Sequence, residues 1–160
     1  MKKSAILFTV FISSILAIQA QTPLVVEIES SADDVWGQIR KMDNIDELSS
    51  FVSKVKWTGP KGIGGERVCT SADGNGHFKE KITGFDDKTR TYSYQVVEGV
   101  PAKNMNNTIK VVDFGYNKSM IVWTSSYEFM ENPNMTKIQF DSFITTARGE
   151  MVKNIIKLVK

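Results

Sequence analysis

Cysteine and histidine are almost absent from this sequence, and proline is rare. Its 160 residues include one cysteine (Cys69), one histidine (His77) and four prolines. One cysteine excludes an intrachain disulfide framework, and one cysteine with one histidine supplies too few of the side chains that usually bind zinc. We therefore expect no disulfide, no metal site and no cofactor.

An excess of charge of either sign is also missing. The 20 Lys and Arg residues are matched by 18 Asp and Glu residues, which leaves a formal net charge of +2. Proteins that bind nucleic acid usually carry a clear basic excess, so no nucleic-acid partner is expected. A hydrophobic fraction of 41% and a charged fraction of 24% are typical of globular proteins, and 160 residues fit one domain.

The N-terminal residues differ from the rest of the chain. Lys2 and Lys3 precede an uncharged, mostly apolar run at residues 5–18, and the small residue Ala20 follows. This pattern predicts a signal peptide at residues 1–20, cleaved after Ala20, and a domain at residues 21–160. The run is too short for a comfortable membrane span, so we expect an exported protein, periplasmic or secreted, with no stable membrane anchor after cleavage. An uncleaved N-terminal anchor is the alternative.

Local patterns predict the order of elements along the domain. Residues 24–28 read as a strand, Ser31 as the N-cap of a first short helix, and residues 45–53 as a second. Six runs typical of antiparallel strands follow, separated by turn residues and by one longer loop at residues 99–107: 55–57, 66–72, 77–85, 91–98, 108–114 and 120–130. Apolar residues from Phe140 to Leu158 recur at helical spacing and predict a long C-terminal helix.

Three stretches in this order resemble a known superfamily. They are residues 31–36, where a polar cap precedes Val35 and Trp36; residues 59–67, where Gly-Pro and further glycines precede Glu-Arg; and residues 80–87, which follow a Glu-Arg-Leu-x-x-x-Asp-Asp pattern and lead into residues 92–99. The chain resembles the START-like (SRPBCC, helix-grip or birch-pollen-allergen-like) superfamily, and within it the polyketide cyclase/dehydrase and lipid-transport branch.

The resemblance implies an α+β helix-grip fold. A seven-stranded curved antiparallel sheet would wrap around the long C-terminal helix, with two short helices after the first strand and a hydrophobic cavity between sheet and helix. Members of the superfamily bind lipids, sterols, hormones or polyketides, and some catalyse cyclisation or dehydration. Fold membership does not choose among these functions.

Alternation along the predicted strand at residues 77–85 places one carboxylate on an apolar face. Phe78, Glu80 and Ile82 share that face. In the related plant hormone receptors the matching glutamate points into the ligand cavity, so the resemblance implies that Glu80 is the polar anchor of a pocket. The alternative is a salt bridge at the cavity mouth without a role in ligand binding.

The same alternation supplies further candidates. Tyr92, Tyr94 and Glu98 share a face of the next strand, where the tyrosines either bind a polar ligand group or belong to the core. The remaining expected ligand-binding residues come from the last two strands and the C-terminal helix: Asn107, Trp123, Ser125, Tyr127, Ile144 and Met151. No residue is assigned a catalytic role.

The two isolated reactive side chains support no catalytic reading. His77 falls on a polar strand face just after a turn, so we interpret it as solvated rather than as a base. Cys69 has no cationic neighbour or partner histidine nearby in sequence, so a buried, inert thiol is expected rather than a nucleophile.

Three functions stay open at this point. The first is an exported binding or carrier protein for a small hydrophobic, lipid-like or aromatic molecule, with the residues at 99–103 as a gate by analogy with related receptors. The second is a cyclase or dehydratase-like enzyme that uses Glu80 or Glu98 as general acid or base and Tyr92 or Tyr94 as proton donor. The third is a module with a filled core and no ligand. Oligomeric state and ligand identity do not follow from the sequence.

Overall fold

The computed structural model describes residues 19–20 and 22–160. The predicted signal peptide therefore lies outside the described residues, apart from Gln19 and Ala20. Those two residues form the short strand β1 (Gln19–Ala20), which pairs with Tyr127 and Ser126.

After two short strands, the described chain contains two short helices, a run of six strands and one long C-terminal helix. In chain order the elements after β1 are β2 (Leu24–Ile28), α1 (Ala32–Ile39), α2 (Ile45–Leu48), β3 (Val52–Thr58), β4 (Glu66–Ser71), β5 (His77–Asp86), β6 (Thr91–Glu98), β7 (Ala102–Gly115), β8 (Lys118–Phe129) and α3 (Lys137–Leu158). The strands form one antiparallel sheet in the order β1-β8-β7-β6-β5-β4-β3, and β2 pairs beside β1 along the same edge of β8.

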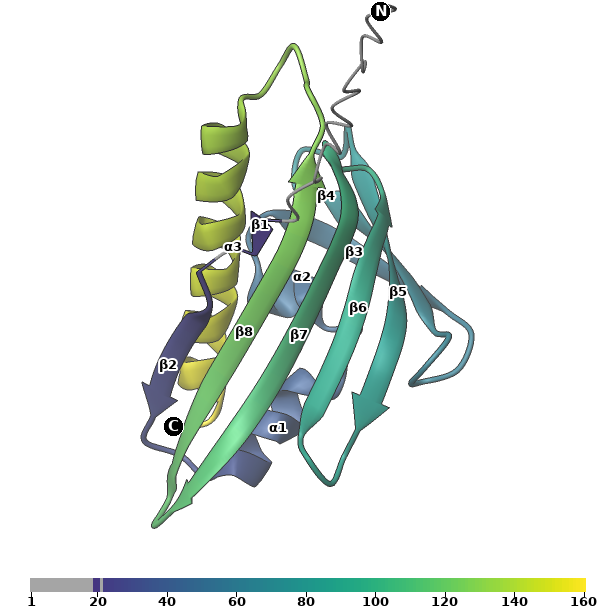
Figure 1. Cartoon of the computed structure of the whole chain (residues 1–160). Helices are drawn as coiled ribbons and strands as arrows, with labels where there is room; N and C mark the ends of the chain where they lie inside the picture. Colours follow the sequence, from purple (N-terminus) through teal and green to yellow (C-terminus); the bar gives the residue numbers. More distant parts are fainter. Residues whose placement is uncertain (1–18, 21) are drawn as a thin grey trace, which may run out of the picture.

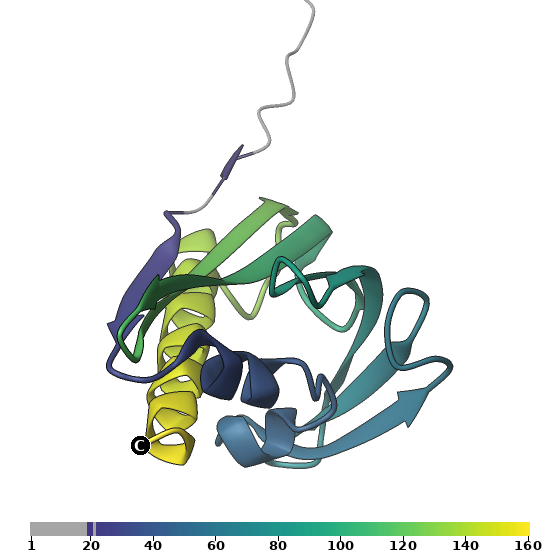
Figure 2. The same cartoon turned by 90° about the horizontal axis from the view of Figure 1, so that it is seen from below.

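The sheet curves around α3, with α1 and α2 closing the side that the sheet leaves open (Figures 1 and 2). The main core lies between these layers, where Phe140, Val152 and Ile155 of α3 are buried in one apolar cluster with Ile82 and Trp123 of the sheet. This is the α+β helix-grip fold with a curved antiparallel sheet of seven principal strands, and the fold prediction is confirmed.

The first helix forms for the reasons its sequence suggests. The Ser31 hydroxyl accepts a hydrogen bond from the Asp34 backbone N–H (3.1 Å), and Asp33 and Asp34 lie in the first turn, where negative charge suits the helix dipole. Val35, Trp36 and Ile39 are buried.

The second helix is shorter than predicted. It ends at Leu48, because Ser49 adopts extended backbone and β3 already begins at Val52. The helical spacing of Ile45, Leu48 and Val52 was misleading, since Val52 is buried as the first residue of a strand.

The predicted loop at residues 99–107 is mostly strand. β7 starts at Ala102, which pairs with Phe129 of β8, so only a tight turn separates β6 from β7. Hydrogen bonding to the long neighbouring strand β8 outweighs the low strand propensity of the polar residues in this stretch.

The long helix α3 begins with a capping box. Thr136 accepts a hydrogen bond from the Gln139 backbone N–H, and the Gln139 side chain accepts one from the Thr136 backbone N–H. The predicted apolar stripe holds for Phe140, Ile144 and Ile155, but Leu158, the last residue of the helix, is 53% exposed.

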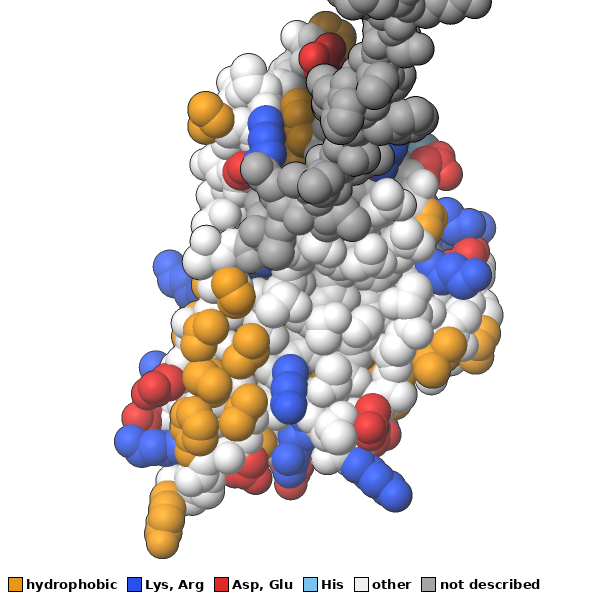
Figure 3. Space-filling model, viewed as in Figure 1, with side chains coloured by type: hydrophobic (Ala, Val, Ile, Leu, Met, Phe, Trp, Pro, Cys, Tyr) orange, Lys and Arg blue, Asp and Glu red, His pale blue; other side chains and the backbone are white. Residues whose placement is uncertain are grey.

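The outer face of the sheet carries apolar side chains over β2 and the adjoining part of β8 (Figure 3). Val25 is 53% exposed there and pairs with Val122 across the strands. Among the described residues, no helix is both long and apolar enough to cross a bilayer.

Two glycines provide a test of the turn geometry. Gly99 (φ +88°) lies so close to β5 that a Cβ would stand 2.0 Å from the His77 carbonyl oxygen, whereas Gly115 (φ +71°) has nothing within 4 Å. We expect Gly115→Ala to lower the free energy of unfolding by about 1–2 kcal/mol, the usual cost of a left-handed alanine. Gly99→Ala should cost clearly more, because the backbone of β5 must move. Urea unfolding measures both; equal losses would contradict the close approach.

Candidate functional site

A cavity of about 100 Å³ lies between the sheet and α3. Its wall on the sheet side consists of two neighbouring rows of paired residues on the inner face. One row runs across β4, β5, β6 and β7 as Arg67, Glu80, Val96 and Met105. The other runs across β6 and β7 as Tyr94 and Asn107, and Asn107 pairs in turn with Ser125 of β8, which does not line the cavity. The opposite wall comes from α3 and the α2–β3 connection, with Phe51, Phe143, Ala147 and Met151.

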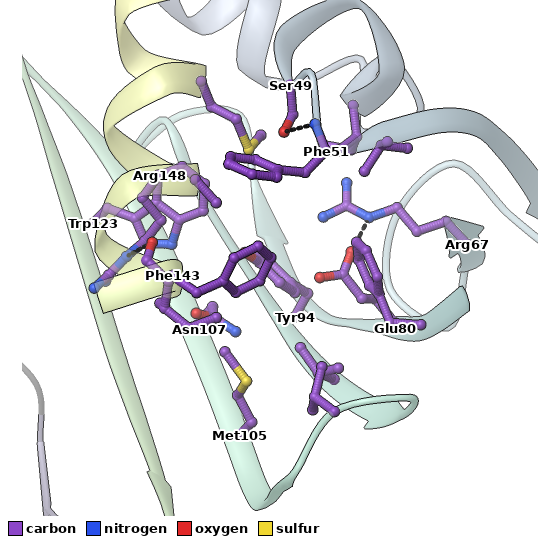
Figure 4. A pocket seen from close by; sticks show the side chains of 18 residues that line it. Ser49, Phe51, Arg67, Glu80, Tyr94, Met105, Asn107, Trp123, Phe143 and Arg148 are labelled. Atoms are coloured by element: carbon purple, nitrogen blue, oxygen red, sulfur yellow. Dashed lines mark hydrogen bonds and ion pairs between the residues drawn. The ribbon is translucent and has the colours of Figure 1, made fainter. Parts of the chain in front are cut away.

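One end of the cavity holds a buried ion pair (Figure 4). Arg67 and Glu80 are 1% and 5% exposed, and Arg67 Nε donates to Glu80 Oε2. The same guanidinium donates from Nη1 to the Met42 carbonyl oxygen and from Nη2 to the Tyr92 hydroxyl (3.5 Å). Its carbon lies 4.9 Å from the centre of the Tyr94 ring, a cation–π distance. Arg67 therefore ties the α1–α2 connection to three strands.

The charges at this end shift the neighbouring pKa values. Burial lowers the pKa of Arg67, but the Glu80 carboxylate beside it acts in the opposite direction, and the pKa ends well above its usual value. Burial, followed by the negative charge of Glu80, raises the pKa of Tyr94 well above that of a free phenol. The guanidinium is thus charged and the phenol neutral at ordinary pH.

The other end of the cavity is lined by Arg148, Trp123 and Asn107 (Figure 4). Arg148 comes from α3 and is 5% exposed; its Nη1 donates to Ser125 Oγ at 3.1 Å. Ser125 Oγ in turn donates to Asn107 Oδ1. Burial lowers the pKa of Arg148, while Tyr94 and Tyr127 act to raise it.

Six of the ten residues predicted to bind a ligand line this cavity. They are Glu80, Tyr94, Asn107, Trp123, Ile144 and Met151. Three others are buried next to it: Ser125 lies behind Asn107, Tyr92 lies behind Arg67, and the Tyr127 hydroxyl donates to Asp141 at the start of α3.

The expectation that Glu98 faces inward is wrong. Its side chain is 61% exposed, and Oε1 lies 3.2 Å from Nε2 of the exposed His77. The strand pairing of β5 with β6 shifts register between Lys79 and Glu80, so the alternation that buries Tyr94 and Val96 does not continue to Glu98. The solvated position expected for His77 is confirmed.

Sequence reasoning missed both arginines of the cavity. Arg67 alternates with the fully buried Cys69 on β4, which marks an inward-facing position. Arg148 follows Ile144 by four residues, so it lies on the buried stripe of α3. In each case the signal was a charged residue at an apolar position of the pattern, which indicates a buried, partnered charge.

The remaining reactive groups do not add chemistry. Burial raises the pKa of the Cys69 thiol to about 12, so this cysteine is an inert core residue, as expected. The described residues contain no group of three or more Cys, His, Asp or Glu side chains that could hold a metal ion.

Solved structures share this architecture. XoxI from Bacillus cereus is 21% identical, with a TM-score of 0.74 over 86% of this chain and 94% of that one. Norcoclaurine synthase from Thalictrum flavum, in complex with dopamine and hydroxybenzaldehyde, is 24% identical, with a TM-score of 0.72 over 99% and 96% of the two chains. At these identities the likeness shows the fold alone.

The sequence comparisons give the family. No curated protein matches the sequence. The model of one family, described as polyketide cyclase / dehydrase and lipid transport, matches residues 19–157, which is most of the chain. Together with the helix-grip fold and the cavity between sheet and α3, this match shows that the chain belongs to the polyketide cyclase/dehydrase and lipid transport family.

Proposed function

We propose that this chain is an exported binding or carrier protein for a small hydrophobic molecule held between the sheet and α3. The observation that carries the proposal is the cavity itself, an apolar space in the core with polar groups at its two ends. Such a combination is typical of small-molecule sites, where apolar walls supply affinity and a few polar groups fix orientation.

The size of the cavity limits the ligand. An apolar cavity of roughly 150 Å³ accommodates benzene, so the space of about 100 Å³ holds a short aliphatic chain, or part of a single ring that extends toward the opening of the cavity. Phe143 lines the cavity and is 38% exposed, so the cavity reaches the surface there. Its ring packs against Phe51 (centroids 5.1 Å apart), and a longer ligand would leave the core past this aromatic pair.

Export is supported by the N-terminal sequence pattern and by the state of the only thiol. Two lysines, an apolar run and a small residue before position 21 are the features of a secretory signal. A single buried cysteine with a raised pKa suits an oxidising compartment, because it neither forms disulfides nor reacts readily.

The enzymatic alternative finds less support in the same geometry. A cyclase or dehydratase needs a proton donor or acceptor at the reacting atoms. The raised pKa of Tyr94 makes it a poor acid, Glu80 is engaged by Arg67, and Glu98 is exposed. A filled core is disfavoured because the large side chains leave the cavity open.

Blocking the cavity tests the binding site. Ala147 of α3 lines the cavity, whereas the preceding residue, Thr146, is exposed. We expect Ala147→Phe to weaken binding of the probe 4-methylbenzyl alcohol at least tenfold, because the added ring occupies the space, and Thr146→Phe to bind as the wild type does. Isothermal titration calorimetry measures both, with thermal unfolding as a check on folding. Equal binding by the two variants would place the site elsewhere.

The Arg67–Glu80 pair should act as one structural unit. Glu80→Gln leaves a buried guanidinium without its counter-charge, and we expect it to lower the free energy of unfolding by about 3–5 kcal/mol. Removing both charges, in Arg67→Met/Glu80→Leu, should cost less than Glu80→Gln alone. Glu98→Gln, at the exposed pair, serves as the control and should change little. A double variant less stable than Glu80→Gln would contradict this interpretation.

The proposal that the chain is exported can be tested separately. The whole chain, expressed in a bacterium, should appear in the periplasmic or medium fraction with Gln21 as its first residue, as read by intact mass. A chain without residues 2–20 should stay in the cytoplasm. Recovery of the uncleaved chain in the membrane fraction would favour the N-terminal anchor instead.

A further inference from the structure

Two buried hydrogen-bond donors line the Arg148 end of the cavity. Asn107 and Trp123 are each 2% exposed, and both line the cavity. Among the described residues, neither Asn107 Nδ2 nor Trp123 Nε1 has a hydrogen-bond partner. Buried polar groups in folded proteins are nearly always paired, so two unpaired donors in one cavity require an explanation.

The orientation of the Asn107 amide follows from its neighbours. Ser125 Oγ accepts from Arg148 Nη1 and donates its single hydrogen to Asn107 Oδ1. This relay uses the oxygen of the amide and leaves the NH₂ group as the free donor. The sheet reinforces the arrangement, since Asn107 and Ser125 are directly paired across β7 and β8.

We infer that the ligand presents an oxygen acceptor to Asn107 Nδ2 and Trp123 Nε1, and that the preferred ligands are small organic acids whose carboxylate lies at this end. The inference rests on the proposed binding function. Unpaired N–H donors that line the same cavity favour an anion, because hydrogen bonds to a charged acceptor are about twice as strong as neutral ones. The positive charge of Arg148 at the same end acts in the same direction (Figure 4).

The opposite end does not suit the acid group. Arg67 is also cationic, but it already binds Glu80, and a second carboxylate there would meet the negative charge of Glu80. Apolar residues such as Val96 and Met105 lie in the row that leads from Glu80 across the sheet. The hydrophobic body of the ligand therefore lies along this row, with its carboxylate pointing to Asn107.

A matched set of three probes tests the inference on the mature chain. The probes are 4-methylbenzoate, 4-methylbenzyl alcohol and 4-methylbenzylammonium, which share a ring and differ in the polar group. By calorimetry we expect the acid to bind about tenfold or more tightly than the alcohol, and the ammonium most weakly. In ¹H–¹⁵N NMR spectra the acid should shift the Trp123 indole N–H signal downfield and leave that of Trp57, outside the cavity, in place.

Two variants remove the donors one at a time. Trp123→Phe keeps an aromatic ring, and Asn107→Asp keeps the oxygen that accepts from Ser125. Each should lose about tenfold in affinity for the acid. Asn107→Asp should also narrow or reverse the preference for the acid over the ammonium. Trp57→Phe is the control, and binding of the alcohol to Trp123→Phe shows that the cavity is still formed.

The outcomes separate this inference from the proposed function. If the alcohol binds as tightly as the acid, or if the acid binds without shifting the Trp123 indole signal, the inference is overturned while the binding function stands. A structural water held by both donors would give this second result. If none of the three probes binds, the proposed function itself fails.

Discussion

The pairing of Arg67 with Glu80 is the interaction on which the rest of the architecture depends. Both side chains are almost fully buried, so neither charge can exist there without the other. The two residues are direct partners in the β4–β5 ladder, and the arginine also holds the Met42 carbonyl of the α1–α2 connection. Met42 has left-handed backbone (φ 62°), an unfavourable state for a methionine that this contact helps to hold. One guanidinium thus fixes how the helical connection closes against the sheet.

The cavity has two chemically different ends, and the Arg67–Glu80 pair forms one of them. At the Arg67 end, positive and negative charges compensate one another and the neighbouring phenol is neutral. At the Arg148 end, the relay through Ser125 uses the Asn107 amide oxygen, and among the described residues Asn107 Nδ2 and Trp123 Nε1 have no partner. A hydrophobic molecule with one polar group would therefore fit in a single direction. The helix-grip fold provides the space between the sheet and α3, but its polar ends are set by these particular residues.

The fold was largely predictable from the sequence, because alternation in the strands and the spacing of Phe140, Ile144 and Ile155 are local signals. Family resemblance supplied the topology that joins them. The site residues were predictable where side chains alternate regularly between the two faces of the sheet, as for Glu80 and Asn107. The prediction was wrong for Glu98, because a register shift interrupts this alternation. Strand pairing of this kind depends on contacts between distant segments. Arg67 and Arg148 were harder to predict, because a charged side chain is normally exposed and only its spacing from buried neighbours indicates that it is buried.

The donors of Asn107 and Trp123, which have no partner among the described residues, also have a consequence for the lifetime of the protein. Each buried N–H group without a partner costs about 1–3 kcal/mol, and a typical domain is stable by only about 5–15 kcal/mol. An empty chain consequently opens more often than a loaded one, and open chains are the form that proteases degrade. If the proposed ligand binds there, the polar end of the cavity would couple turnover to supply, and chains would accumulate when the ligand is abundant.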